Sequence, residues 1–157
     1  MLFSKFYLCG GVGKGKTKLS SYDSALYSCG IGDFNLIRVS SIIPPGAAML
    51  AELPSGIRPG SLVHIVDACN YGDQVHKLLA SYIGIAVPED RRLPGVIMEY
   101  STSSSSHQCR EIVQGGLQEA MERRGIAKFT VTFRESIHKI EQPGFMFCTF
   151  AACVFFP

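Results

Sequence analysis

The sequence contains little charge for its length, and this shortage excludes several classes of protein. Only 18% of the 157 residues are charged, whereas 46% are hydrophobic, a balance that is too apolar for a disordered polyelectrolyte. The net charge is +2 and the lysines and arginines are scattered, so the sequence has no basic patch for nucleic acid or an anionic membrane. We therefore expect neither nucleic acid nor a membrane as a partner. The low charge favours assembly with further copies of the chain.

Metal-site and membrane-spanning patterns are also missing. None of the six cysteines forms a C-x-x-C pair and the four histidines are isolated, so the clustered ligands of a structural zinc site are lacking. The most apolar run, residues 144–157, is too short to span a bilayer and predicts a buried strand. No secretory leader is recognisable, and we expect a cytoplasmic protein with free thiols.

The chain does contain strand and helix patterns within a length that suits one domain. Helical spacing of apolar residues predicts helices over 17–29 and 107–125, the second with Ser106 as its N-cap and Arg123 on its polar face. Short apolar runs bounded by turn residues predict strands over 3–9, 34–40, 61–68, 94–101, 128–137 and 145–156. The segment 75–87 fits either a helix entering a strand or one long strand. This mixture predicts an α/β or α+β layered sandwich.

The segment Gly10 to Thr17, GGVGKGKT, satisfies the phosphate-binding pattern G-x-x-x-x-G-K-[ST] between a predicted strand and a predicted helix. Asp67, at the end of another predicted strand, could supply a magnesium ligand to such a P-loop nucleotide-binding protein. Against this function stand the short chain and the shortage of helices, because a doubly wound sheet needs one between nearly all strands. The structural alternative is a glycine-rich turn with solvent-facing lysines.

A serine pair, Ser40 and Ser41, ends the predicted strand 34–40 just before two prolines. The spacing by itself fits a strand that enters a loop, but it also permits self-cleavage. The Ser41 hydroxyl would attack the Ser40 carbonyl carbon and exchange the amide for an ester, and β-elimination followed by hydrolysis would leave a pyruvoyl group and release ammonia. This reaction needs a bent backbone and a donor to the oxyanion, and the Asn35 amide could be that donor.

The segment 20–46, SSYDSALYSCGIGDFNLIRVSSIIPPG, resembles the signature region of the pyruvoyl-dependent arginine decarboxylases. Weaker similarity extends through most of the remaining chain to the final apolar strand. The resemblance implies an αββα sandwich of the pyruvoyl-dependent histidine/arginine decarboxylase type, assembled as a homotrimer or hexamer with sites between subunits. It also implies cleavage between Ser40 and Ser41 into a β chain, 1–40, and an α chain, 41–157.

The resemblance implies the reaction and the site residues as well. L-arginine would be converted to agmatine and CO2 with a covalent pyruvoyl group formed from Ser41, without pyridoxal phosphate or a metal. Asn35 would assist processing, Asp23 would receive the guanidinium of arginine, and Glu99 would protonate the product after CO2 leaves. A carboxylate suits planar, bidentate recognition of a guanidinium.

The chain departs from the family pattern directly after Glu99, where YSTSSSS, residues 100–106, replaces a stretch that contains histidine and glycine. Because this departure adjoins the expected catalytic acid, a non-catalytic relative of the decarboxylases remains an alternative to the active enzyme.

Overall fold

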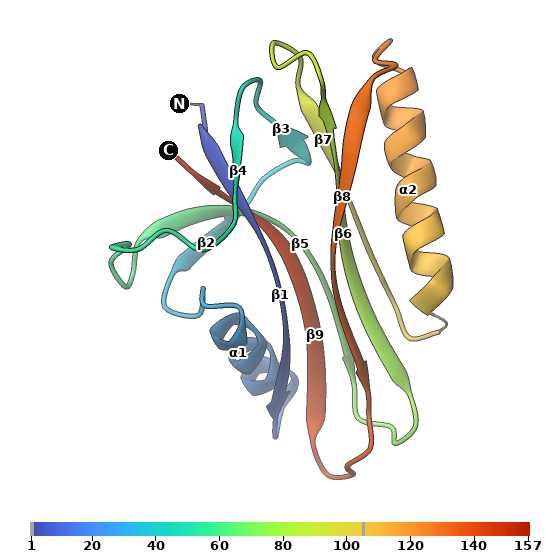
Figure 1. Cartoon of the computed structure of the whole chain (residues 1–157). Helices are drawn as coiled ribbons and strands as arrows, with labels where there is room; N and C mark the ends of the chain where they lie inside the picture. Colours follow the sequence, from blue (N-terminus) through green and yellow to red (C-terminus); the bar gives the residue numbers. More distant parts are fainter. Residues whose placement is uncertain (1, 105) are drawn as a thin grey trace.

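The computed structural model, which describes residues 2–104 and 106–157, has two sheets packed face to face with one helix on each outer face (Figure 1). The first sheet has the order β2-β5-β9-β1-β4 and consists of β1 (Lys5–Gly15), β2 (Asn35–Arg38), β4 (Ala48–Leu50), β5 (Leu62–Gly72) and β9 (Met146–Phe156). The second has the order β3-β7-β6-β8 and consists of β3 (Ile42–Ile43), β6 (Leu78–Pro88), β7 (Gly95–Thr102) and β8 (Phe129–Lys139). Helix α1 (Lys18–Ser28) covers the first sheet and α2 (Ser106–Glu122) the second. The predicted αββα sandwich is confirmed.

Three main apolar cores hold these layers together among the described residues: one between the sheets, one under α1 and one under α2. A smaller cluster consists of Leu79, Ile140 and Phe147. β9 lies at the centre of the first sheet and contributes to two of the main cores, because successive strand residues point to opposite faces. Ala151 and Cys153 enter the core between the sheets, whereas Phe150 and Val154 enter the core under α1. The predicted burial of this strand is confirmed, and its unbroken apolar run follows from burial on both faces.

The first predicted helix is present with both of its ends defined. The Thr17 hydroxyl accepts a hydrogen bond from the Ser20 N–H at 3.1 Å, and Gly30, with φ of 76°, follows the last turn. The helical spacing predicts one apolar face made of Leu19, Tyr22, Ala25, Leu26 and Cys29. This prediction is wrong at Leu19, which is 78% exposed, while Ser21 is buried against the sheet instead.

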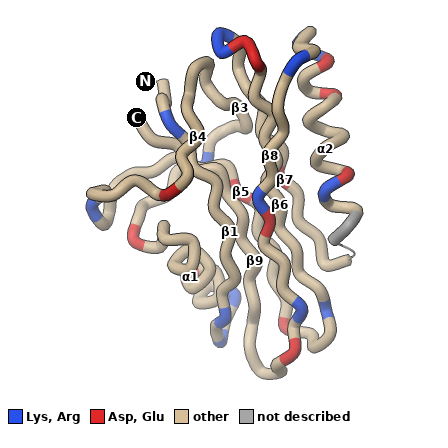
Figure 2. Tube along the Cα trace, viewed as in Figure 1, with Lys and Arg blue, Asp and Glu red and all other residues tan. Residues whose placement is uncertain are grey.

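The second predicted helix is confirmed as α2, although the predicted capping by the Ser106 side chain lies outside the described side chains. Its apolar stripe faces the second sheet except at Ile112, which is 48% exposed. The ambiguous segment 75–87 is resolved as a strand, since β6 runs from Leu78 to Pro88. None of the described helices is long and apolar enough to cross a membrane. Figure 2 shows acidic and basic residues close to one another in the loops and on α2, with uncharged stretches along the strands.

The glycine-rich segment is not a turn, which corrects both interpretations of the phosphate-binding pattern. Residues 10–15 form the second half of β1 and pair with β9 from Gly10↔Ala151 to Gly15↔Met146. α1 packs directly on this half, and a Cβ atom added at Gly13 would overlap the backbone of the helix. The glycines therefore allow close helix packing, and an extended strand cannot wrap around a phosphate as a P-loop does.

We predict that Gly13→Ala lowers the free energy of unfolding by about 1–3 kcal/mol, because its methyl group would meet the Ser21 carbonyl oxygen and the Ala25 nitrogen. Gly115→Ala is the matched control. Gly115 lies within α2, and no atom lies within 4 Å of a Cβ added there, so this variant should raise the free energy of unfolding by about 0.5–1 kcal/mol. Thermal or urea denaturation measures both. Equal stability of the two variants would contradict this account of the β1 glycines.

Candidate active site

The serine pair lies in the short link by which the chain passes from one sheet to the other. β2, which precedes it, is an edge strand of the first sheet, and β3, which follows it, is an edge strand of the second. On one side the Val39 N–H donates to the Ile65 carbonyl at 3.0 Å, and on the other the Ile97 N–H donates to the Ser41 carbonyl at 2.9 Å. The peptide bond between Ser40 and Ser41 is therefore held between two sheets.

The backbone bends sharply at Ser41. The Ile42 N–H donates to the Ser40 carbonyl oxygen at 2.9 Å, and this bond between residues two positions apart closes a three-residue turn. Because Ser41 has a negative φ, the turn is an inverse γ-turn. The bent backbone that the self-cleavage chemistry requires is thus present at the serine pair.

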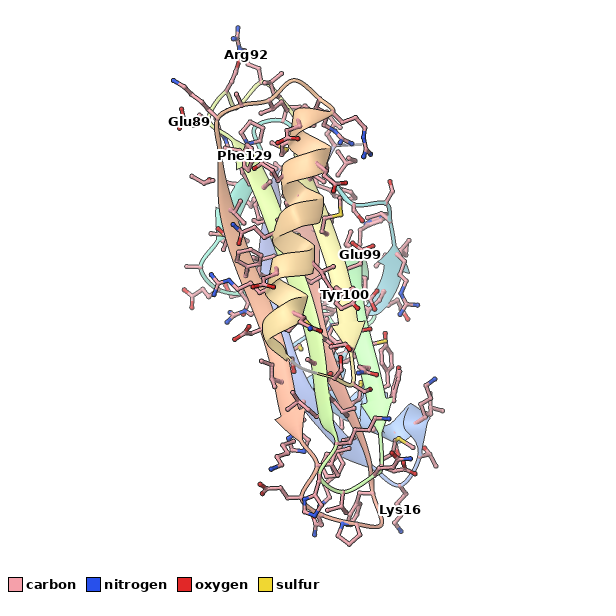
Figure 3. The ribbon with its side chains drawn as sticks, turned by 90° about the vertical axis from the view of Figure 1, so that its right-hand side faces the viewer. Lys16, Glu89, Arg92, Glu99, Tyr100 and Phe129 are labelled. Atoms are coloured by element: carbon pink, nitrogen blue, oxygen red, sulfur yellow. The ribbon has the colours of Figure 1, made fainter. Side chains whose placement is uncertain are left out.

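The side chain of Ser41 meets that of Glu99. The Ser41 hydroxyl lies 3.0 Å from Glu99 Oε2 and 3.3 Å from Oε1 and donates to the carboxylate. Glu99 lies on β7, beside α2 (Figure 3), and β7 pairs with β3 through Ile42↔Val96. This pairing brings together two predicted site residues that are 58 positions apart.

An open cleft of about 340 Å³ contains Ser40, Ser41 and Glu99. Its other side is formed by the end of α2, where Arg123 and Arg124 line it. The Arg124 guanidinium donates to the Ala120 carbonyl at 2.8 Å. The sequence placed Arg123 on the polar face of the helix and gave no sign that it borders the site. Its position depends on how α2 packs on the sheet.

Asn35 and Asp23 do not reach this cleft within one chain. Asn35 is the first residue of β2 and its amide donates to the Gly60 carbonyl at 2.8 Å. Ser40 lies five positions further along the chain, a span of roughly 16 Å at the usual rise of a strand. Asp23 is exposed on α1, which covers the outer face of the first sheet, away from the second. Self-cleavage assisted by Asn35 of the same chain is therefore not supported by this geometry.

Asp67, which the sequence suggested as a magnesium ligand, is instead paired with Arg38. The Arg38 guanidinium donates to both carboxylate oxygens, at 2.6 and 3.0 Å, and the Asp67 side chain is only 3% exposed. The hydrogen bonds with Asp67 raise the pKa of Arg38 further above its usual range. This pair fixes the end of β2 two residues before Ser40. In the described part of the chain, no group of three or more His, Cys, Asp or Glu side chains is arranged to hold a metal ion.

Comparison with known proteins identifies the family of this chain. The family model described as pyruvoyl-dependent arginine decarboxylase matches residues 5–157. Relatives of that name include one from Methanococcus maripaludis strain C7, 37% identical over 145 residues, and one from Methanocaldococcus jannaschii, 34% identical over 148; each match covers 92% of this chain and 85% of the relative. Pyruvoyl-dependent arginine decarboxylase 2 from Methanosarcina acetivorans is 33% identical over 164 residues, covering 98% of this chain and 86% of the relative. The chain belongs to the pyruvoyl-dependent arginine decarboxylase family.

Proposed function

We propose that this chain cleaves itself between Ser40 and Ser41 and then converts L-arginine to agmatine and CO2. The observation that carries the proposal is the contact between the Ser41 hydroxyl and the Glu99 carboxylate at 3.0 Å, inside a cleft of a chain from this family. The products of cleavage would be a β chain, 1–40, and an α chain, 41–157. We also propose a cytoplasmic location, in line with cysteines that form no disulfide bond among the described residues.

The residues around Ser41 suit a pyruvoyl group built on that position. The group supplies a ketone that binds the substrate's amine and accepts the electrons that CO2 leaves behind. Residue 41 opens into the cleft, and its side chain is within hydrogen-bonding reach of Glu99, so the Glu99 carboxyl remains beside any group formed there. Glu99 supplies the proton that the α-carbon of the substrate takes up when CO2 departs.

The guanidinium of arginine needs an acid that one chain does not provide. Among the described residues that line the cleft, Glu99 is the one acid and stands against two arginines, Arg123 and Arg124. The cleft therefore binds a cationic substrate only if another subunit contributes a further carboxylate to it. In this proposal, Asp23 of a neighbouring copy provides it, and Asn35 likewise assists processing across a subunit boundary.

The surface around Asp23 supports this assembly. Leu19 and Tyr27 lie four residues on either side of Asp23 on α1 and are 78% and 73% exposed. Residues at this spacing share one face of a helix, so the acid sits in an exposed apolar stripe. Exposed apolar surface of this kind marks protein–protein contacts, and a homotrimer or hexamer would cover it.

Self-cleavage provides the first test of the proposed function. Denaturing mass spectrometry of the purified wild-type chain should find two fragments that meet between Ser40 and Ser41, the larger one with a blocked N-terminus. Ser41→Ala should stay a single chain because it has no hydroxyl to attack the carbonyl, whereas the exposed Ser55→Ala should be cleaved like the wild type. An intact wild-type chain after long incubation, with no carbonyl that hydroxylamine or borohydride can trap, would refute the proposal and favour a non-catalytic relative.

The second prediction separates processing from decarboxylation. Glu99→Gln should still cleave itself, because the glutamine side-chain oxygen can accept the hydrogen bond from Ser41, but its decarboxylation rate should fall about 10²–10⁴-fold without a proton donor. Release of CO2 from labelled arginine measures the rate. Glu89→Gln is the control, an exposed acid just past the end of β6 and away from Glu99 (Figure 3), and should retain full activity. Normal turnover by Glu99→Gln would remove the proposed role.

A further inference from the structure

Self-cleavage places a negative charge on the Ser40 carbonyl oxygen when the Ser41 hydroxyl attacks. Such an oxyanion is stabilised by donors 2.7–3.1 Å from the position that the charged oxygen takes up, and losing one such donor typically costs about 10²–10³-fold in rate. The Ile42 N–H lies 2.9 Å from this oxygen and donates to it. The Asn35 amide of the same chain instead donates to Gly60. We infer that the main-chain N–H of Ile42 is the oxyanion donor for self-cleavage, an inference that rests on the proposed function.

The Ile42 N–H is fixed in place before the reaction begins. Ile42 belongs to β3 and pairs with Val96 on β7, while the neighbouring Ser41 carbonyl accepts from Ile97. On the other side of the serine pair, the backbone is bonded to the first sheet at Val39. The turn therefore cannot open without breaking strand contacts, and a donor held in this way needs no reorganisation when the charge appears.

The same turn organises both partners of the reaction. The Ile42 N–H polarises the Ser40 carbonyl, and the Glu99 carboxylate holds the Ser41 hydroxyl on the other side. As Oγ bonds to the carbonyl carbon, the hydroxyl proton passes to solvent water in the open cleft, and from this water the Ser41 nitrogen later regains a proton. The C–N bond between the serines then breaks and the nitrogen of Ser41 takes up a proton, which completes the ester.

The second stage releases Ser40 together with the attacking oxygen. The Ser41 α-proton passes to solvent water in the open cleft, its bonding electrons form the Cα–Cβ double bond, and the Cβ–Oγ bond breaks. Ser40 leaves as a carboxylate that carries Oγ, and a dehydroalanine remains. Water then replaces the nitrogen of the dehydroalanine, which departs as ammonia, and the ketone remains. The Ile42 N–H acts only in the first stage, so its removal should slow the appearance of the ester and of everything after it.

The test replaces the amide linkage of Ile42 with an ester, by incorporating the α-hydroxy analogue of isoleucine, in the full-length chain. This change removes the N–H and keeps the isoleucine side chain. We expect cleavage to slow by about 10²–10³-fold in a mass-spectrometric time course. The same replacement at Ile43, which also lies in β3 but does not donate to Ser40, should cleave within a few-fold of the wild-type rate.

Wild-type speed in the Ile42 ester chain, or an equal loss of rate in the Ile43 ester chain, would overturn the inference and leave the proposed function intact. No cleavage of the wild type would instead refute the proposed function. A second measurement does not depend on folding of the ester chain: in uncleaved Ser41→Ala, NMR should detect the scalar coupling between the Ile42 nitrogen and the Ser40 carbonyl carbon across the hydrogen bond. Its absence in the folded variant would also overturn the inference.

Discussion

The peptide bond between Ser40 and Ser41 belongs to a link that is bonded to a different sheet on each side. Before it, the Arg38 guanidinium is fixed to both oxygens of Asp67, a carboxylate that is nearly inaccessible to solvent. After it, the Ser41 carbonyl is bonded to the Ile97 N–H of β7. Because the packed sheets resist deformation, the link keeps its bend. The conformation that the proposed cleavage needs is therefore imposed by the whole sandwich rather than by the local sequence.

The apolar composition of the chain follows from the same architecture. Each sheet is covered on its inner face by the other sheet and on its outer face by a helix, so strands such as β6 and β9 are buried on both sides. Few strand positions are therefore exposed to water, where charged side chains are stable, and this accounts for a chain in which only 18% of the residues are charged. The glycines of β1 serve the same packing, because they let α1 approach the outer face of the first sheet closely.

The electrostatics of the cleft connect the fold to assembly. Arg123 and Arg124 border the cleft because α2 ends beside β7, and they outnumber the single acid Glu99 among the described residues that line it. Such a cleft disfavours a guanidinium unless another carboxylate is added. Asp23 stands between two exposed apolar side chains on a distant helix face. In the proposed enzyme, recognition of the substrate guanidinium therefore depends on formation of the oligomer.

Local patterns were enough to predict a layered α/β or α+β fold and both helices, because periodicity is a property of the chain itself. The serine pair and Glu99 were proposed as site residues through the resemblance to a known family. Local patterns failed where one segment is compatible with two structures. GGVGKGKT matches a phosphate-binding loop, yet its residues Gly10 to Gly15 form a strand because each of them pairs with a residue of β9. Only the tertiary structure decided that the Ser41 hydroxyl contacts the Glu99 carboxylate. The same holds for the ion pair between Arg38 and Asp67 and for the hydrogen bond from the Ile42 N–H to the Ser40 carbonyl. Each of these depends on which strands become neighbours. That choice is made by burial of the sheet faces over the whole chain, which no short segment encodes.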